Sequence, residues 1–113
     1  MPNIEISVVI PCKNEAENLA ILLNEVDEAL KGRTFEVIVV NDGSTDKTGD
    51  TLNARIKHGA KHLRHIRHDR SSGQSAAVRS GVFAAKGQYI ATMDGDGQNN
   101  PAYIPSLVDA LKV

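Results

Sequence analysis

The stretch ISVVIPCKNEAENLAILLNEVDEALKGRTFEVIVVNDG, residues 6–43, sets two short β-branched runs on either side of a segment with helical patterning. The runs at 6–10 and 35–40 end at Pro11 and at the turn-forming residues 41–43. Short apolar runs that stop at such residues are typical of buried parallel strands. The stretch therefore predicts a β-α-β unit.

The helix between these runs follows from the spacing of its apolar residues. Five of them recur at helical intervals: Leu19, Leu22, Leu23, Val26 and Leu30. Asn14 and Glu17 stand three residues apart, as in a capping box, and Gly32 is placed as a helix stop. We therefore expect a helix that begins near Asn14 and ends before Gly32.

The rest of the chain repeats the alternation of strands and helices. We expect a helix over 46–58, a polar strand at a sheet edge over 61–67, a helix over 73–85, a fourth strand over 89–93 and a last helix from Pro101. The helix over 73–85 has a face of small residues that permits close approach to a sheet, namely Ala77, Gly81, Ala84 and Ala85. This order predicts an α/β fold, a Rossmann-like parallel sheet with right-handed crossovers and flanking helices.

Polar clusters follow three of the four expected strands. They are PCKNE at 11–15, NDGS at 41–44 and DGDGQ at 94–98. In open α/β sheets, ligands bind beyond the carboxyl ends of the strands. We therefore expect the three clusters to converge on one crevice.

The composition narrows the classes of function. The 113-residue chain has a formal net charge of −1, 4% aromatic residues and no tryptophan, which argues against nucleic-acid binding. The single cysteine, Cys12, has no partner for an internal disulfide. No segment resembles a signal peptide or a membrane-spanning helix, so a cytoplasmic location is the default expectation.

Asp94 and Asp96 lie two residues apart in a glycine-flanked loop. Their like charges repel each other, so the loop needs either a compensating cation or enough water to screen the repulsion. Taken singly, Asp42-Gly43 and Asp94-Gly95 also have a purely local interpretation as turns. A plain turn does not need carboxylates at neighbouring strand ends, so the clusters together favour a functional site.

Three segments together resemble the successive signatures of the family 2 glycosyltransferases with the GT-A fold: SVVIPCKNEAENL (7–19), EVIVVNDGSTDKTG (36–49) and GQSAAVRSGVFAAKGQYIATMDGDGQNNP (73–101). The resemblance is nearest to the dolichyl-phosphate and polyprenyl-phosphate mannosyltransferase-like enzymes. It spans almost the whole chain in order, which makes it far more specific than a lone Asp-x-Asp. The resemblance implies that residues 1–113 are the N-terminal, nucleotide-sugar-binding portion of a longer catalytic domain.

The resemblance implies a nucleotide-binding role for several residues. Pro11, Lys13 and Glu15 are expected at the nucleoside pocket. Val40 and Asp42 are expected to hold the base and the ribose, Asp42 by accepting hydrogen bonds from the nucleotide.

The resemblance also identifies the family's Asp-x-Asp element. Asp94 and Asp96 are the implied catalytic residues, with Asp94 and Gly95 near the ribose. Asp96 and Gln98, with Asp94 beside them, are the implied ligands of a Mg²⁺ or Mn²⁺ ion that bridges the donor's diphosphate. Arg79 is a candidate phosphate contact, although an arginine near an acidic loop is more often a solvated ion pair.

Two residues depart from the commonest family pattern. Asn41 stands where many members have an aspartate, and Lys13 where the lipid-phosphate enzymes often have an aromatic residue. Neither departure removes the implied metal site. Both leave open which nucleobase is bound.

For the histidines and the cysteine, we favour structural roles over metal binding or catalysis. In an extended strand His62 and His65 point to opposite faces, so we interpret the histidines at 58, 62, 65 and 68 as a solvated edge rather than a metal site. Cys12 has no evident base beside it in the sequence, and we expect a small buried filler rather than a nucleophile.

The expected activity is inverting, metal-dependent transfer of a hexose to a polyprenyl or dolichyl phosphate at the membrane surface, in cell-envelope glycan biosynthesis. The expected donor is a nucleotide-diphosphate sugar of the GDP-mannose or UDP-glucose type. A nucleotide-sugar-binding module without turnover and a transferase acting on a saccharide hydroxyl stay open as alternatives, as does a homo-oligomer. A dinucleotide-dependent oxidoreductase is disfavoured because no G-x-G-x-x-G turn follows the first strand.

The end of the chain bears on its completeness. The last expected helix reaches Val113 without a glycine cap, and the apolar fourth strand would be left at a sheet edge. We therefore expect an incomplete domain. Its acceptor-binding half, and any membrane helices, would lie outside these residues.

Overall fold

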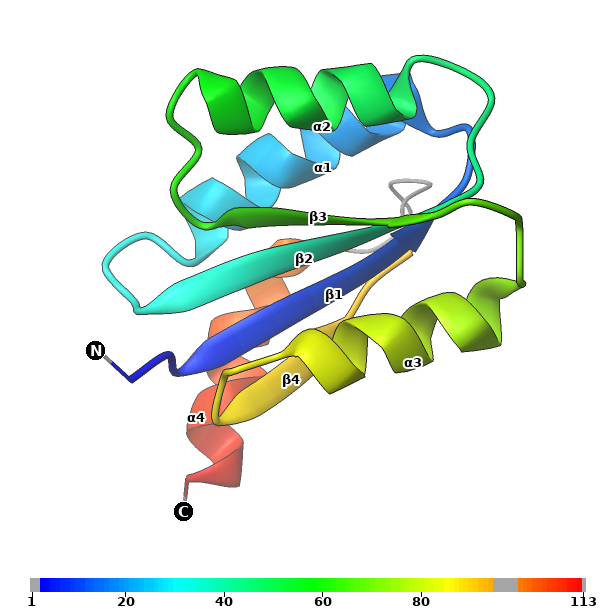
Figure 1. Ribbon diagram of the computed structural model, residues 1–113. Helices are drawn as coiled ribbons and strands as arrows, with labels where there is room; N and C mark the ends of the chain where they lie inside the picture. The colour runs from blue at the N-terminus through cyan, green and yellow to red at the C-terminus, as the bar shows by residue number, and fades with distance from the viewer. Residues whose placement is uncertain (1–2, 95–99, 113) are drawn as a thin grey trace.

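The computed structural model describes residues 3–94 and 100–112, which form a sheet covered by helices on both faces (Figure 1). The elements in chain order are β1 (Ile6–Cys12), α1 (Ala16–Ala29), β2 (Phe35–Asp42), α2 (Thr48–Lys57), β3 (Leu63–His68), α3 (Gln74–Ala84), β4 (Tyr89–Thr92), a 3₁₀ turn (Pro101–Tyr103) and α4 (Ile104–Leu111). The α/β alternation predicted from the sequence is confirmed.

The four strands are parallel and lie in the order β3-β2-β1-β4. β1 and β2 pair along the whole of β1, from Ile6 opposite Phe35 to Cys12 opposite Asn41. The chain moves outward from β1 to β3 and then returns to place β4 on the other side of β1. The strand order thus reverses between β1 and β4, and ligands in open α/β sheets bind at the carboxyl ends beside such a reversal.

The two faces of the sheet are covered differently. α1, α2 and α4 contribute to the larger core on one face, and α3 packs on the other (Figure 1). α3 lies close to the sheet because its inner residues are small. A Cβ added at Gly81 would lie 2.3 Å from Cγ1 of Val9, and Ala77 is fully buried. The predicted small-residue face is confirmed.

The capping box predicted for α1 is wrong. The N-cap is Glu15, and its own side chain makes no capping hydrogen bond. Asn14 has a left-handed backbone, with φ 55°, and its side-chain oxygen accepts hydrogen bonds from the backbone N–H groups of Thr45 and Asp46. Asn14 therefore ties the β1–α1 loop to the β2–α2 loop, which is a tertiary contact that local spacing does not reveal.

The edges of the sheet are β3 and β4. The polar edge strand predicted over 61–67 corresponds to β3, and the apolar fourth strand is at the opposite edge, as expected. On α4, Ile104 and Val108 are buried, whereas Leu107 and Leu111 are largely exposed. β4 and α4 together line an apolar groove beside this edge.

Candidate functional site

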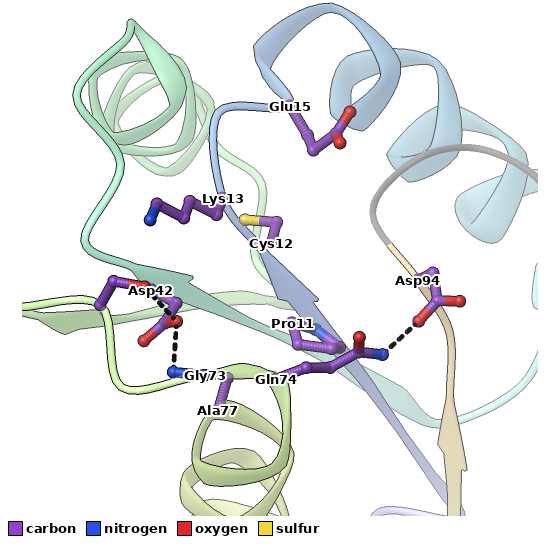
Figure 2. A pocket seen from close by; sticks show the side chains of 10 residues that line it. Pro11, Cys12, Lys13, Glu15, Asp42, Gly73, Gln74, Ala77 and Asp94 are labelled. Atoms are coloured by element: carbon purple, nitrogen blue, oxygen red, sulfur yellow. Dashed lines mark hydrogen bonds between the residues drawn. The ribbon is translucent and has the colours of Figure 1, made fainter.

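A cavity of about 340 Å³ opens at the carboxyl ends of the central strands. It is lined by the ends of β1 and β2, the start of α3 and the residue after Met93 (Figure 2): Pro11, Cys12, Lys13, Glu15, Asp42, Ser71, Gly73, Gln74, Ala77 and Asp94. Each of the three polar clusters contributes residues to the lining of this cavity. Their predicted convergence is confirmed for the residues that the structure describes.

Asp42, the last residue of β2, lies beneath the β3–α3 loop. Its Oδ1 accepts hydrogen bonds from Nδ1 of His68 and from the backbone N–H of Ser72, both at 2.8 Å. Its Oδ2 accepts from the backbone N–H of Gly73 at 3.0 Å and from the Ser71 hydroxyl at 3.1 Å. The carboxylate thus holds the loop that precedes α3 with both of its oxygens.

These hydrogen bonds decide the charge state of Asp42. Burial by itself raises the pKa of the carboxyl, but the bonds from Ser72, His68, Gly73 and Ser71 outweigh it and lower the pKa to about 2. A carboxylate has about four acceptor positions, and all are used here within the chain. For Asp42 to accept a hydrogen bond from a nucleotide, as predicted, one of these donors must be exchanged. The longest of the four bonds is that of the Ser71 hydroxyl.

Gly43 allows the β2–α2 turn to approach the same loop. A Cβ at this position would lie 2.6 Å from the backbone nitrogen of Ser71 and 2.9 Å from the carbonyl carbon of Arg70, and φ is +72°. Backbone atoms cannot move aside as the tip of a flexible side chain can. A larger residue here must displace the loop.

The β1–α1 loop forms another wall of the cavity, with exposed Lys13 and partly buried Glu15. The backbone N–H of Glu15 donates to the hydroxyl of Thr48 at 3.2 Å, and that of Ala16 to Oδ2 of Asp46 at 3.4 Å. The β2–α2 loop and the first residue of α2 thus hold this wall in place. Pro11, Lys13 and Glu15 all line the cavity, and their contact with a nucleotide stays a prediction.

Cys12 is buried at the end of β1 and also lines the cavity. Burial raises the pKa of its thiol to about 12, and the charges of Asp46, Glu15 and Asp42 act in the same direction. The thiol is therefore neutral at physiological pH. This agrees with the prediction of a small filler rather than a nucleophile.

Asp94 and Asp42 are linked through the start of α3. The side-chain Nε2 of Gln74, the first residue of α3, donates to Oδ1 of Asp94 at 2.8 Å (Figure 2). The preceding residue, Gly73, donates its backbone N–H to Asp42. Of these two consecutive residues, Gly73 contacts Asp42 and Gln74 contacts Asp94. Any shift of the start of α3 therefore moves both sides of the cavity.

Some predicted site residues lie elsewhere. Val40 is fully buried on the face that α3 covers, in a cluster with Ala77, and does not line the cavity. Arg79 is exposed on α3 and is not part of the cavity wall either. Gly95, Asp96 and Gln98 lie outside the described residues, so their predicted roles remain predictions.

The interpretation of the four histidines as a solvated edge is wrong for His68, whose side chain is 17% exposed and bonded to Asp42. His62 stacks on Phe35, and Nδ1 of His65 lies 3.0 Å from Oδ1 of Asn53, so these two share no site. Within residues 3–94 and 100–112, no three side chains of His, Cys, Asp or Glu gather as a metal site.

Sequence reasoning missed four residues of this site: His68, Ser71, Gly73 and Gln74. The available signal was positional. His68 and Ser71 lie between an expected strand and an expected helix, and Gly73 and Gln74 begin that helix, at the carboxyl edge where the polar clusters converge.

The sequence profile described as Glycosyl transferase family 2 matches residues 7–113. The chain is 41% identical to the dodecaprenyl-phosphate galacturonate synthase of Rhizobium johnstonii over 97% of its length, and 38% identical to the dolichol-phosphate mannosyltransferase of Pyrococcus furiosus over 96%. These matches cover 33% and 30% of the relatives, so the chain spans about a third of their length.

Solved structures share the fold. A mannosyltransferase from Pyrobaculum calidifontis in complex with GDP-Man and Mn²⁺ superposes with a TM-score of 0.79 at 21% identity, over 99% of this chain and 32% of that one. Glucosyl-3-phosphoglycerate synthase from Mycobacterium tuberculosis gives a TM-score of 0.75 at 25% identity, over 95% of this chain and 38% of that one. The parallel sheet with its flanking helices thus matches part of GT-A transferases.

None of the helices in the described part of the chain is both long enough and apolar enough to cross a membrane. The profile match, the relatives and the fold all agree with the resemblance seen in the three sequence segments. The chain belongs to glycosyl transferase family 2.

Proposed function

We propose that the full protein transfers a hexose from a nucleotide-diphosphate sugar, with inversion at the anomeric carbon, to a polyprenyl or dolichyl phosphate. The observation that carries the proposal is the match to relatives named for dodecaprenyl, dolichol and undecaprenyl phosphates, at 41%, 38% and 37% identity. These matches include the residues that build the cavity. The sugars in the three names differ, so the donor sugar is left to experiment.

The two sides of the cavity suit two different parts of the nucleotide-sugar donor. We assign the nucleoside to the side of Asp42, whose carboxylate shapes the wall, and the diphosphate to the side of Asp94. Lys13 is an exposed cation on the cavity wall and suits phosphate oxygens. The Ser71 hydroxyl is the group best placed to exchange its bond with Asp42 for one with the ribose.

The predicted metal ligands fit a hard divalent cation. Asp94, Asp96 and Gln98 offer carboxylate and amide oxygens, which Mg²⁺ and Mn²⁺ prefer. Asp94, the described member of the set, lines the cavity. When bound there, such a cation would stabilise the negative charge that accumulates on the leaving diphosphate.

A phosphate acceptor agrees with the groups on the cavity wall. A sugar hydroxyl needs a general base with a pKa near neutrality, whereas a lipid phosphate arrives already deprotonated. Histidine is the usual base of this kind, and the described lining residues contain none. Asp42 and Cys12 do not suit general-base catalysis either, because neither has a pKa near neutrality: that of Asp42 is about 2 and that of Cys12 about 12.

We further propose that residues 1–113 are the donor-binding portion of a longer catalytic domain that works on the cytoplasmic side of a membrane. The relatives are about three times as long as their matched segment. Their named acceptors are lipid phosphates, which reside in membranes. The acceptor site would then be formed with residues outside this chain.

The full-length protein tests the reaction. It should be offered labelled GDP-mannose, UDP-glucose and nucleoside-diphosphate galacturonate with either a polyprenyl phosphate or an oligosaccharide. Label on the lipid phosphate supports the proposal. Label only on the oligosaccharide refutes the acceptor, and saturable binding without turnover or hydrolysis identifies a binding module.

Metal dependence is tested by calorimetry with nucleoside diphosphates, with and without Mn²⁺. We expect Asp96→Ala to abolish the Mn²⁺-dependent part of the affinity, because it removes an implied metal ligand. Asp42→Ala should weaken binding of the nucleoside itself with or without metal. Asp50→Ala, on the exposed first turn of α2, is the matched control. Equal Mn²⁺ dependence in the wild type and Asp96→Ala would contradict the metal assignment.

A further inference from the structure

His68 has two side-chain hydrogen-bond partners, buried Asp42 and partly buried Ser80, that set it apart from the other histidines. It is the last residue of β3 and lies opposite Asp42 in the strand register. Its Nδ1 is 2.8 Å from Oδ1 of Asp42, and its Nε2 is 2.9 Å from Oγ of Ser80 on α3. The imidazole thus connects the cavity carboxylate to the middle of a helix.

The partners determine where the proton of the neutral ring lies. Asp42 is ionised, so its oxygen accepts and cannot donate, and Nδ1 of His68 must carry the proton. Nε2 of the neutral ring is then an acceptor, and the Ser80 hydroxyl must be its donor. A hydroxyl can donate or accept, so Ser80 supports the ring orientation that the Asp42 carboxylate selects.

The remaining bonds of Asp42 explain what this ring controls. The same carboxylate accepts from the backbone N–H groups of Ser72 and Gly73, which fixes the loop in front of α3. Without the His68 bond, Oδ1 would keep only the Ser72 donor, and three bonds instead of four would hold the carboxylate. A carboxylate that is held less firmly fixes the N–H groups of Ser72 and Gly73 less firmly.

We propose that His68 is a positioning residue of the donor site, which orients the Asp42 carboxylate and through it the cavity wall at 71–73. The inference deepens the proposed function, on which it rests for the identity of the ligand. His68 itself is absent from the cavity lining, so it acts through Asp42 and not by touching the nucleotide.

His65 provides a matched control on the same strand. It lies three residues before His68, and its Nδ1 bonds to the side chain of Asn53. It has no bond to Asp42. Replacing it tests the general cost of losing a histidine from β3 without disturbing the carboxylate.

The first measurement uses no nucleotide. In the full-length protein, nitrogen NMR of the imidazole should show a protonated Nδ1 for His68, in the wild type and in Ser80→Ala alike, because the Asp42 carboxylate can only accept. In His68→Phe, hydrogen exchange at the amides of Ser72 and Gly73 should accelerate by about tenfold. Unchanged exchange at both amides would overturn the proposal.

The second measurement is nucleoside-diphosphate affinity by calorimetry. We expect His68→Phe to weaken binding by about tenfold and His68→Asn, whose amide N–H can replace Nδ1–H, to restore it to within about threefold. His65→Phe should stay within about twofold of the wild type. Should His68→Phe fail to fold, Ser80→Ala carries the test, with an expected loss of about threefold that His68→Asn in the same chain should remove.

The two proposals fail in different ways. If the wild type binds none of the nucleotides, the proposed function is refuted while the exchange experiment still decides the role of His68. If the wild type binds and His68→Phe, Ser80→Ala and His65→Phe all match it, the positioning role is refuted and the proposed function stands.

Discussion

β2 carries two buried carboxylates, Glu36 near its start and Asp42 at its end, and each holds one end of α3. Asp42 accepts from the backbone N–H groups of Ser72 and Gly73, just before the helix. Glu36 accepts from the backbone N–H of Lys86, just after it, at 2.6 Å. Both carboxylate side chains are nearly inaccessible to solvent: that of Asp42 is 7% exposed and that of Glu36 is 4% exposed.

The two ends differ in the partner that β3 supplies. Glu36 is paired with Arg64, whose Nη1 donates to Oε1 at 2.7 Å, whereas Asp42 is paired with His68. Ser7 on β1 completes the Glu36 end by donating its hydroxyl to Oε2 at 2.7 Å. A guanidinium is charged at every accessible pH, while an imidazole has two tautomers and a titratable proton.

The same arrangement thus occurs at both ends of β2: a buried carboxylate pairs with a side chain of β3 and accepts from backbone N–H groups next to α3. At the amino end of the sheet the network anchors the helix and borders a cavity of about 350 Å³ to which none of the three polar clusters contributes. At the carboxyl end the same arrangement anchors the helix beside the cavity on which the polar clusters converge. Changes at the two ends should therefore separate stability from ligand binding.

The largest expected effect is that of Glu36→Ala. It leaves the Arg64 guanidinium, the Ser7 hydroxyl and the N–H of Lys86 without their acceptor, and breaking such a buried charged network costs about 3 kcal/mol. Urea denaturation of the full-length protein measures the free energy of unfolding. Nucleotide affinity of the folded fraction should stay near the wild-type value, and a tenfold loss would contradict the assignment of this end to stability alone.

Asp42→Asn should change how stability depends on pH. The pKa of Asp42 falls from an ordinary value of 3.8 to about 2 in the folded protein, so its stabilising effect is complete above about pH 4 and is lost as the pH falls toward 2. Asparagine has no such titration. The stability gap between wild type and variant should therefore narrow between pH 4 and pH 2, as followed by urea denaturation at several pH values. A constant gap would show that the carboxylate is not the titrating group.

Two glycines provide a matched pair with a smaller effect. A Cβ at Gly87 would lie 2.6 Å from the backbone nitrogen of Ser7, and one at Gly43 would lie 2.6 Å from that of Ser71. Each alanine variant should lose about 2 kcal/mol of stability, because backbone must move to make room. Thermal unfolding with parallel calorimetry distinguishes them, since only Gly43→Ala should weaken nucleotide binding. Similar affinities for both variants would argue against the loop at 71–73 as part of the donor site.

The smallest effect is expected for Arg64→Lys. Arg64 Nη1 donates both to Glu36 and to the backbone carbonyl of Ala84, at 2.7 and 2.8 Å. Lysine keeps the charge but loses the planar geometry that serves both acceptors, at a cost of about 1 kcal/mol. Thermal unfolding measures this change. A loss as large as that of Glu36→Ala would mean that the guanidinium, and not the carboxylate, is the centre of the network.

Much of the fold was predictable because its determinants are local. The β-branched runs of β1 and β2, the helical spacing in α1 and the small face of α3 are periodic patterns that each element carries by itself. The convergence of the polar clusters followed from the geometry of parallel sheets, and Pro11, Lys13, Glu15, Asp42 and Asp94 all line the cavity.

What failed depended on contacts between distant segments. Asn14 and Glu17 have the spacing of a capping box, yet the Asn14 oxygen binds N–H groups more than thirty residues away. Val40 follows the family pattern, but the close approach of α3 covers it. The histidines looked alike in sequence, and only the pairing of β3 with β2 gave His68 a carboxylate and left His65 without one.

The sequence by itself determined the order of strands and helices, the edge of the sheet at which the polar clusters converge, and the family, because hydrophobic periodicity and three ordered motifs are properties of a linear chain. The tertiary structure alone decided which atoms satisfy Asp42, and therefore its charge, the shape of the loop above it and the tautomer of His68. Hydrogen bonds between buried groups depend on positions fixed to within a few tenths of an ångström, and such positions arise only after β2, β3 and α3 have packed together.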